Sequence, residues 1–293
     1  MDPREAEMRE ALVAIMVNTI VWILRLIPGI LVNSLALIAE AWHSLSDNMT
    51  SIMVYLGGRL GSKPPDKEHP YGHGKIVDLA TLFMGLALIV IGISILYESI
   101  QRFLSGYSIA LQFLGSALIV VIITGIIKEF LARYALKLYR ISGSMLCYAD
   151  AWHHRVDALM SIAVFVSFVG IIFLDTYLLD ILSAIIIAVL LGYEGGKIFV
   201  ESVSIIIDTI PKGIEARIMD IAKSVTGVDE VHDVKARSYG GKMYAEIKVH
   251  VDPKLSIEEA HEIAHKIEEK VKSGIPNIEE VLVHVEPSSE HED

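Results

Sequence analysis

Two stretches of the sequence repeat one pattern: AEAWHSLSDNMTSI at Ala39–Ile52 and ADAWHHRVDALMSI at Ala149–Ile162. Each contains His-x-x-x-Asp inside a long apolar region. At one constant offset the two stretches share Ala39/Ala149, Ala41/Ala151, Trp42/Trp152, His43/His153, Asp47/Asp157, Ser51/Ser161 and Ile52/Ile162.

On a helix, residues i and i+4 lie on the same face. Two such helices, face to face, would direct the imidazoles of His43 and His153 and the carboxylates of Asp47 and Asp157 at one point. Zinc accepts a tetrahedral nitrogen and oxygen site of this kind. Ionisable side chains inside a membrane are costly, so they indicate function. The pattern therefore predicts a membrane protein that handles a divalent metal.

The composition supports a membrane domain joined to a soluble one. Of the 293 residues, 53% are hydrophobic and 21% are charged, and the charges gather in the connections and in the last third. The net charge of −11 and the lack of a basic stripe argue against a nucleic-acid partner. A single cysteine, Cys147, excludes an internal disulfide and a Cys-rich metal site. The start, MDPREAEMRE, lacks the basic region of a signal peptide, so we expect the first apolar run to be retained.

Six apolar stretches are long enough to span a bilayer, which needs about 20 residues. We place them at 11–32, 35–58, 76–100, 111–136, 150–174 and 178–206, with breaks near Pro28-Gly29 and Asn33-Ser34. These spans predict a six-helix transmembrane α-bundle over residues 1–209, followed by a cytoplasmic domain over residues 210–293.

Basic residues alternate between the connections. The loop between the second and third spans and the region between the fourth and fifth are basic, whereas the other connections hold only Arg102. The basic residues are Arg59, Lys63, Lys67, Lys75, Lys128, Arg133, Lys137 and Arg140. By the positive-inside rule, both termini and the two basic regions face the cytoplasm of a multi-pass protein in the cell (inner or plasma) membrane.

The pattern changes to that of a soluble domain from Pro211. It predicts a helix at Ile214–Val225, strands at Val231–Arg237 and Met243–Val251 joined by a turn at 239–242, and a last strand at Val281–Val285. The sequence Ser256-Ile257-Glu258-Glu259 is a capping box that opens a helix to Lys272. This order of elements predicts a compact α+β domain of αββαβ type.

The residues leave alternatives open. The His-Asp pairs could instead be buried hydrogen-bonding groups that hold helices together. An intramembrane metalloenzyme would need a general base beside the metal, yet no His-Glu-x-x-His occurs, and Glu40 lies about 60–100° of helix rotation from the His43/Asp47 face. A metal sensor merely anchored in the membrane would not need ionisable pairs in two spans.

The two His-x-x-x-Asp pairs, the loop HPYGHGK at His69–Lys75 and the α+β tail resemble the cation diffusion facilitator family over nearly the whole chain. The phrases SLALIAEAWHSLSD and AWHHRVDALMSIAV are specific to it. The resemblance implies a homodimeric exporter of divalent metal by proton antiport, not an enzyme and without a cofactor, in which the metal is the substrate and a possible regulator. It makes His43, Asp47, His153 and Asp157 the transport site. A histidine at position 43 is common among zinc-selective members, while iron, cadmium, cobalt and manganese stay open.

The resemblance also implies two further sites. Asp66, His69 and His73 match a second metal site of some members, although a solvated Pro/Gly-rich loop is the alternative. Lys75 and Asp208 match a basic and acidic packing pair near the dimer axis of relatives.

In the tail, the family's binuclear site between subunits corresponds to His232, His261, His284 and Glu286. The usual histidine of the second strand is Lys248 here, and His250, on the same face, is its possible substitute. The alternative is a set of surface histidines on an acidic domain.

Overall fold

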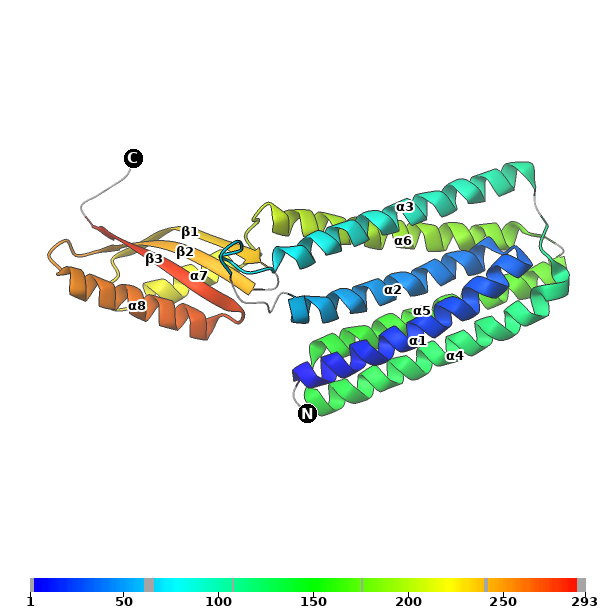
Figure 1. The fold of residues 1–293 in the computed structure, drawn as a ribbon, viewed down its shortest axis with the longest axis horizontal. Coiled ribbons are helices and arrows are strands. Elements are labelled where there is room, and N and C mark those ends of the chain that lie inside the picture. Colours follow the sequence, from blue (N-terminus) through cyan, green and yellow to red (C-terminus); the bar gives the residue numbers. More distant parts are fainter. Residues whose placement is uncertain (1–2, 61–65, 107, 175, 240–241, 289–293) are drawn as a thin grey trace. The chain divides into compact units, whose positions relative to one another are not determined.

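A computed structural model describes residues 3–60, 66–106, 108–174, 176–239 and 242–288 (Figure 1). The chain divides into two compact units, Met1–Leu56 with Thr81–Phe199, and Gly57–Ala80 with Val200–Asp293. Each unit is described by itself below.

Residues 3–206 include six long helices, as the apolar spans predict. They are α1 (Pro3–Val32), α2 (Leu35–Leu60), α3 (Lys75–Ser105), α4 (Leu111–Ser142), α5 (Met145–Leu174) and α6 (Leu178–Ile206). Among the described residues, α1, α3, α4, α5 and α6 are long and apolar enough to cross a membrane by length and composition. The sixth, α2, carries His43 and Asp47 of the repeated pattern.

The helix boundaries differ from the predicted breaks at one point. Helix α1 continues through Pro28 and ends at Val32, where Asn33 adopts a left-handed conformation with φ of 63°. The next helix begins at once. Ser34 Oγ accepts from Leu37 N, and Asp180 of α6 accepts from Leu35 N at 2.8 Å, so a carboxylate satisfies the amino end of α2.

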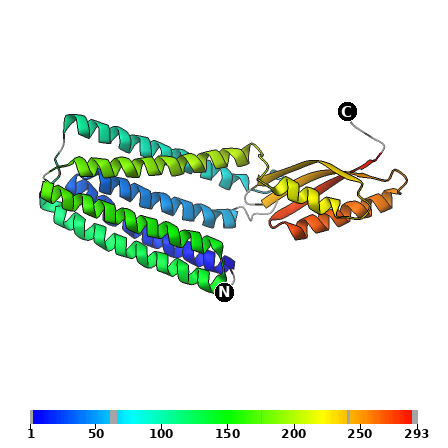
Figure 2. The ribbon, with the colours of Figure 1, turned by 180° about the vertical axis from the view of Figure 1, so that it is seen from behind.

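Helices α3 and α6 approach each other closely through glycines. A Cβ on Gly85 would lie 2.7 Å from the backbone N of Phe199, and one on Gly92 would lie 2.9 Å from the carbonyl O of Ala188. Small residues allow this backbone approach where apolar burial gives no driving force, as is common between membrane helices. Figures 1 and 2 show α3 beside α6, with α1, α2, α4 and α5 grouped together.

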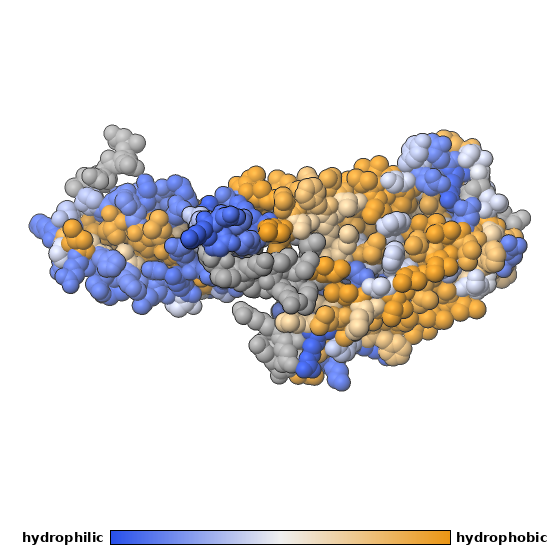
Figure 3. Space-filling view, in the orientation of Figure 1, coloured by the Kyte–Doolittle hydropathy of each residue, from blue (hydrophilic) through white to orange (hydrophobic). Residues whose placement is uncertain are grey.

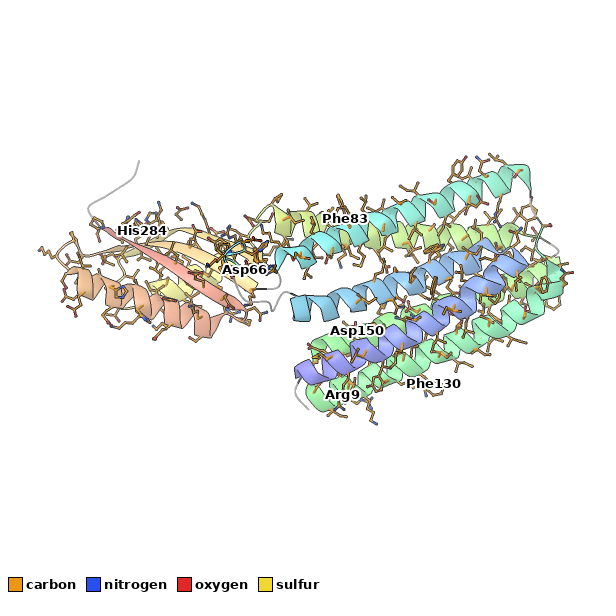
Figure 4. All side chains as sticks on the ribbon, viewed as in Figure 1. Arg9, Asp66, Phe83, Phe130, Asp150 and His284 are labelled. Atoms are coloured by element: carbon orange, nitrogen blue, oxygen red, sulfur yellow. The ribbon has the colours of Figure 1, made fainter. Side chains whose placement is uncertain are left out.

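The outer faces of these helices are apolar. Phe83 on α3 and Phe130 on α4 point outward and are 58% and 64% exposed (Figure 4). Apolar side chains cover most of the helical surface seen in Figure 3, whereas hydrophilic ones dominate the tail domain. Such a surface fits lipid, since a soluble protein rarely exposes apolar patches of this extent.

The tail domain has the predicted αββαβ order. It comprises α7 (Ile214–Lys223), β1 (Glu230–Tyr239), β2 (Lys242–Val251), α8 (Ile257–Gly274) and β3 (Ile278–Pro287). Residues 240–241 of the predicted turn lie outside the described residues. In the sheet, β2 lies between β1, which is antiparallel to it, and β3, which is parallel.

A single apolar core joins the two tail helices to the sheet. Ile218 of α7 and Ile267 of α8 are fully buried against Ile247 and Val249 of β2. The capping box at the start of α8 is confirmed: Ser256 Oγ accepts from Glu259 N, and the Glu259 carboxylate accepts from Ser256 N. These two bonds satisfy two amides that no helical carbonyl can reach.

Candidate metal centres

The two repeated pairs meet inside the helical unit. His43 and Asp47 come from α2, and His153 and Asp157 come from α5. One ligand atom of each lies within 4.8 Å of the others. The pairs are crossed: His43 Nε2 lies 3.2 Å from Asp157 Oδ1, and His153 Nε2 lies 3.2 Å from Asp47 Oδ1. The i,i+4 spacing therefore brings the four predicted ligands to one point.

The four side chains of this cluster differ in exposure. The side chains of His43, Asp47 and Asp157 are 3%, 5% and 1% exposed, whereas that of His153 is 40% exposed. Burial excludes water from the carboxylates, which strengthens their attraction for any cation that reaches them. His153 is therefore the most exposed of the four side chains.

A lysine occupies the centre of the cluster. Lys128 of α4 is fully buried, and its Nζ lies 2.8 Å from Asp47 Oδ2 and 2.7 Å from Asp157 Oδ2. The pattern of basic residues predicts Lys128 to belong to the cytoplasmic region between the fourth and fifth spans, and this prediction is wrong. Helix α4 runs on to Ser142, so Lys128 lies well inside it. Its place within the predicted span 111–136 could have indicated this, because an ionisable residue inside a membrane span is costly and marks a functional position.

A second buried ion pair lies beside the site. The Arg25 guanidinium of α1 lies 3.1 Å from Glu40 Oε1, and both side chains are 1% exposed. Arg25 also donates to Ser44, Ser161 and Thr124 at 2.7, 2.6 and 3.2 Å. Ser161 in turn donates to Glu40 at 2.8 Å. Arg25 therefore ties α1 to α2, α4 and α5 within a helical turn of the metal cluster, and Glu40 serves as its counter-ion.

Two more acids approach the cluster through histidines. His154 Nε2 lies 3.1 Å from Glu10 Oε1 of α1, and its Nδ1 lies 3.8 Å from Asp157 Oδ2. His43 Nδ1 lies 3.7 Å from Glu194 Oε2 of α6. Sequence spacing could not indicate the contacts with Glu10 and Glu194, because they join helices that are distant in sequence, whereas His154 and Asp157 are three residues apart on α5.

The loop before α3 gathers its three predicted ligands. Asp66 Oδ1 lies 3.3 Å from His69 Nδ1, and Asp66 Oδ2 lies 3.4 Å from His73 Nε2. The backbone amides of His69 and Glu68 donate to Asp66, and the amide of His69 is the main reason that the pKa of this carboxyl is lowered. The loop can thus present one carboxylate and two imidazoles to a cation. In the same unit, Lys75 Nζ lies 3.3 Å from Asp208 Oδ1.

The tail brings together only part of its predicted set. His232, His250 and Glu286 offer ligand atoms within 4.8 Å of one another, and the rings of His232 and His250 lie 4.5 Å apart. His284 Nε2 lies 3.2 Å from Glu286 Oε1. In the described chain, His261 is not a member of this cluster, and its ring lies edge-on to that of His265.

Lys248 lies next to the tail cluster. It pairs across the sheet with His232 on one side and with His284 on the other. Its Nζ lies 3.5 Å from Asp233 Oδ2 and 3.8 Å from Glu286 Oε1. The ion pairs with Lys235 and Lys248 lower the pKa of the Asp233 carboxyl. His250 therefore joins the cluster, and the lysine contacts the same glutamate.

Two family models cover this architecture. The cation efflux transmembrane domain matches residues 11–207, and the cytoplasmic domain of cation efflux proteins matches residues 210–288. The chain belongs to the cation efflux family. It is a multi-pass membrane protein and a divalent cation efflux transporter rather than an enzyme.

Relatives along nearly the full length agree with the family assignment. This cation efflux protein is 32% identical over 97% of its length, and 99% of the other chain, to a protein described as an uncharacterised transporter of Methanocaldococcus jannaschii. It is 30% identical to the manganese efflux system protein MneP of Bacillus subtilis, over 94% of this chain and 95% of MneP. It is also 30% identical to the magnetosome protein MamM of Paramagnetospirillum magneticum, over 94% of this chain and 86% of MamM.

Proposed function

We propose that this cation efflux protein exports zinc from the cytoplasm in exchange for protons, through His43, Asp47, His153 and Asp157. The crossed geometry of the two His-Asp pairs carries this proposal, because it supplies two carboxylates and two imidazoles within one ion's reach. The carboxylates balance the charge of a divalent ion in a site sheltered from water. The imidazoles add borderline nitrogen donors.

The same four side chains supply the exchange. Each can hold either a metal ion or a proton, so metal loading releases protons and protonation releases metal. The partly exposed His153 receives the ion from the cytoplasmic side, and the helices then open the site outward. Binding can shift this equilibrium only by as much as the metal prefers one of the two states. The proton gradient then drives the empty, protonated site back to the state that is open to the cytoplasm.

Zinc and manganese are the two metals to compare. Imidazole suits zinc, whereas manganese favours carboxylate, carbonyl and water oxygens. The paired histidines support zinc. The name of the relative MneP favours manganese as the second candidate.

We further propose a homodimer in the cell membrane with both termini in the cytoplasm, and a domain boundary near residue 210. In it the Lys75–Asp208 pair would lie near the dimer axis. Asp66, His69 and His73 would form a loop site, and His232, His250 and Glu286 would form a tail site that biases the transport cycle. His284 and, from across the dimer, His261 would complete the tail site.

Metal flux into proteoliposomes tests the proposal. Vesicles loaded with a metal-sensitive dye are given zinc or manganese, with and without a pH gradient, and the wild type is compared with Asp157→Ala. We expect gradient-dependent zinc uptake in the wild type and none in the variant. Equal uptake by both proteins would refute the site, and uptake of manganese but not of zinc would refute the choice of metal.

A further inference from the structure

We propose that Lys128 is a tethered competitor for the transported metal: its ammonium group holds the two carboxylates of the site and must be displaced when a divalent ion binds. This inference rests on the proposed transport site. It assigns to Lys128 a positioning role in metal affinity and release.

The hydrogen bonds of the site leave no carboxylate oxygen unoccupied. Asp47 Oδ1 faces His153, and Asp157 Oδ1 faces His43, each at 3.2 Å. The two Oδ2 atoms face Lys128 Nζ at 2.8 and 2.7 Å. A zinc ion bound by these aspartates would need oxygens at about 2.0–2.2 Å. The ammonium and the metal therefore compete for the same two carboxylate groups.

Lys128 is the cation that pairs with the two aspartates of the site. The other buried cation of this region, Arg25, is held by Glu40 through the ion pair at 3.1 Å. Among the described residues, the two aspartates also face His43, His153 and His154, and the acids Glu10, Asp150 and Glu194 lie beyond these histidines. With neutral imidazoles, Lys128 cancels one of the two carboxylate charges. The metal-free site then keeps one net negative charge instead of two inside the bundle, where an uncompensated carboxylate would be costly.

Glu10 of α1 is a buried acid next to the site, because His154 contacts both Glu10 and Asp157. The lysine stem is long and flexible, so its ammonium can leave the aspartates without movement of α4. Once the metal has left, the ammonium returns and closes the site to immediate rebinding.

The test separates affinity from rate. Zinc uptake is measured over a range of zinc concentrations for the wild type, for Lys128→Met, which keeps the stem and removes the charge, and for Lys128→Arg. The matched control is Lys137→Met, at an exposed position of the same helix. We expect the half-saturating zinc concentration of Lys128→Met to fall about tenfold or more, with a lower maximal rate because release is slow. Lys128→Arg keeps the competing charge and should show no such fall.

The outcomes distinguish this role from a structural one. A residue that only stabilises the fold would lower the maximal rate and leave the half-saturating concentration unchanged, so an unchanged or raised value in Lys128→Met overturns the proposal. If that variant cannot be purified, Lys128→Gln is measured with the same expectation and the same refuting result. Failure of the transport site itself would show separately, as equal uptake by the wild type and Asp157→Ala.

Discussion

Replacement of Arg25 by Met should destabilise the helical unit strongly. Arg25 and Glu40 are both 1% exposed, and Arg25 donates three further hydrogen bonds, to Ser44, Thr124 and Ser161. Glu40 Oε2 has no hydrogen-bond partner among the described residues, so Glu40 depends on its Oε1 contacts. Methionine fills a similar volume without charge, and it leaves a buried carboxylate unpaired.

The expected cost is about 3–5 kcal/mol, the range found when one partner of a buried ion pair is removed. At about 2–4 °C for each kcal/mol in a domain of this size, the thermal midpoint of the purified protein in detergent should fall by roughly 10 °C. The double variant Arg25→Met/Glu40→Gln removes both charges, and its midpoint should recover most of the loss.

The control is Arg133→Met, at an exposed position on α4 whose ion pair with Glu129 lies within one helix. Exposed pairs of this type contribute about 0.3–0.5 kcal/mol, so its midpoint should hardly move. The reasoning is refuted if Arg25→Met and Arg133→Met behave alike, or if adding Glu40→Gln deepens the loss of stability.

Two further predictions concern the metal preference and the tail. His43→Asp replaces a nitrogen donor by an oxygen donor, so the ratio of manganese or iron flux to zinc flux should rise in competition assays; an unchanged ratio would exclude His43 from metal selection. Ser256→Ala removes the side-chain cap of α8, at a cost of about 1 kcal/mol. Hydrogen exchange of the Glu259 amide should become about fivefold faster in that variant, while Ser273→Ala on the same helix should leave it unchanged.

Periodicity predicted the framework of the molecule because it follows from local rules. Apolar runs fixed the long helices, and the order of helices and strands in the tail followed from residue alternation and one capping box at Ser256. The His-Asp cluster was also accessible from sequence, since a spacing of four places two side chains on one helical face. The repeat of that spacing on a second helix supplied its counterpart.

The charges around the cluster could not be predicted in this way. Lys128, Arg25 and Glu194 meet the site from α4, α1 and α6, and no spacing rule relates these helices to α2 or α5. Which face of each helix points inward depends on packing, which the weak amphipathicity of membrane helices hardly indicates. In the sequence, these positions can be recognised only because an ionisable residue inside an apolar span is costly and therefore indicates function.

A transporter must release the ion that it selects, and the surroundings of the His-Asp cluster serve both demands. A closed site of four protein ligands holds zinc with an apparent binding free energy of about 10–16 kcal/mol in small structural domains, which would trap the cargo. Here the side chain of His153 is 40% exposed, so this ligand can exchange with water. The buried ammonium of Lys128 can also pair with the carboxylates in place of the metal. Two histidines and two aspartates alone would release the metal only through protonation. In our proposal, the ammonium of Lys128 adds a second competitor for the same carboxylates and so favours release of the metal ion.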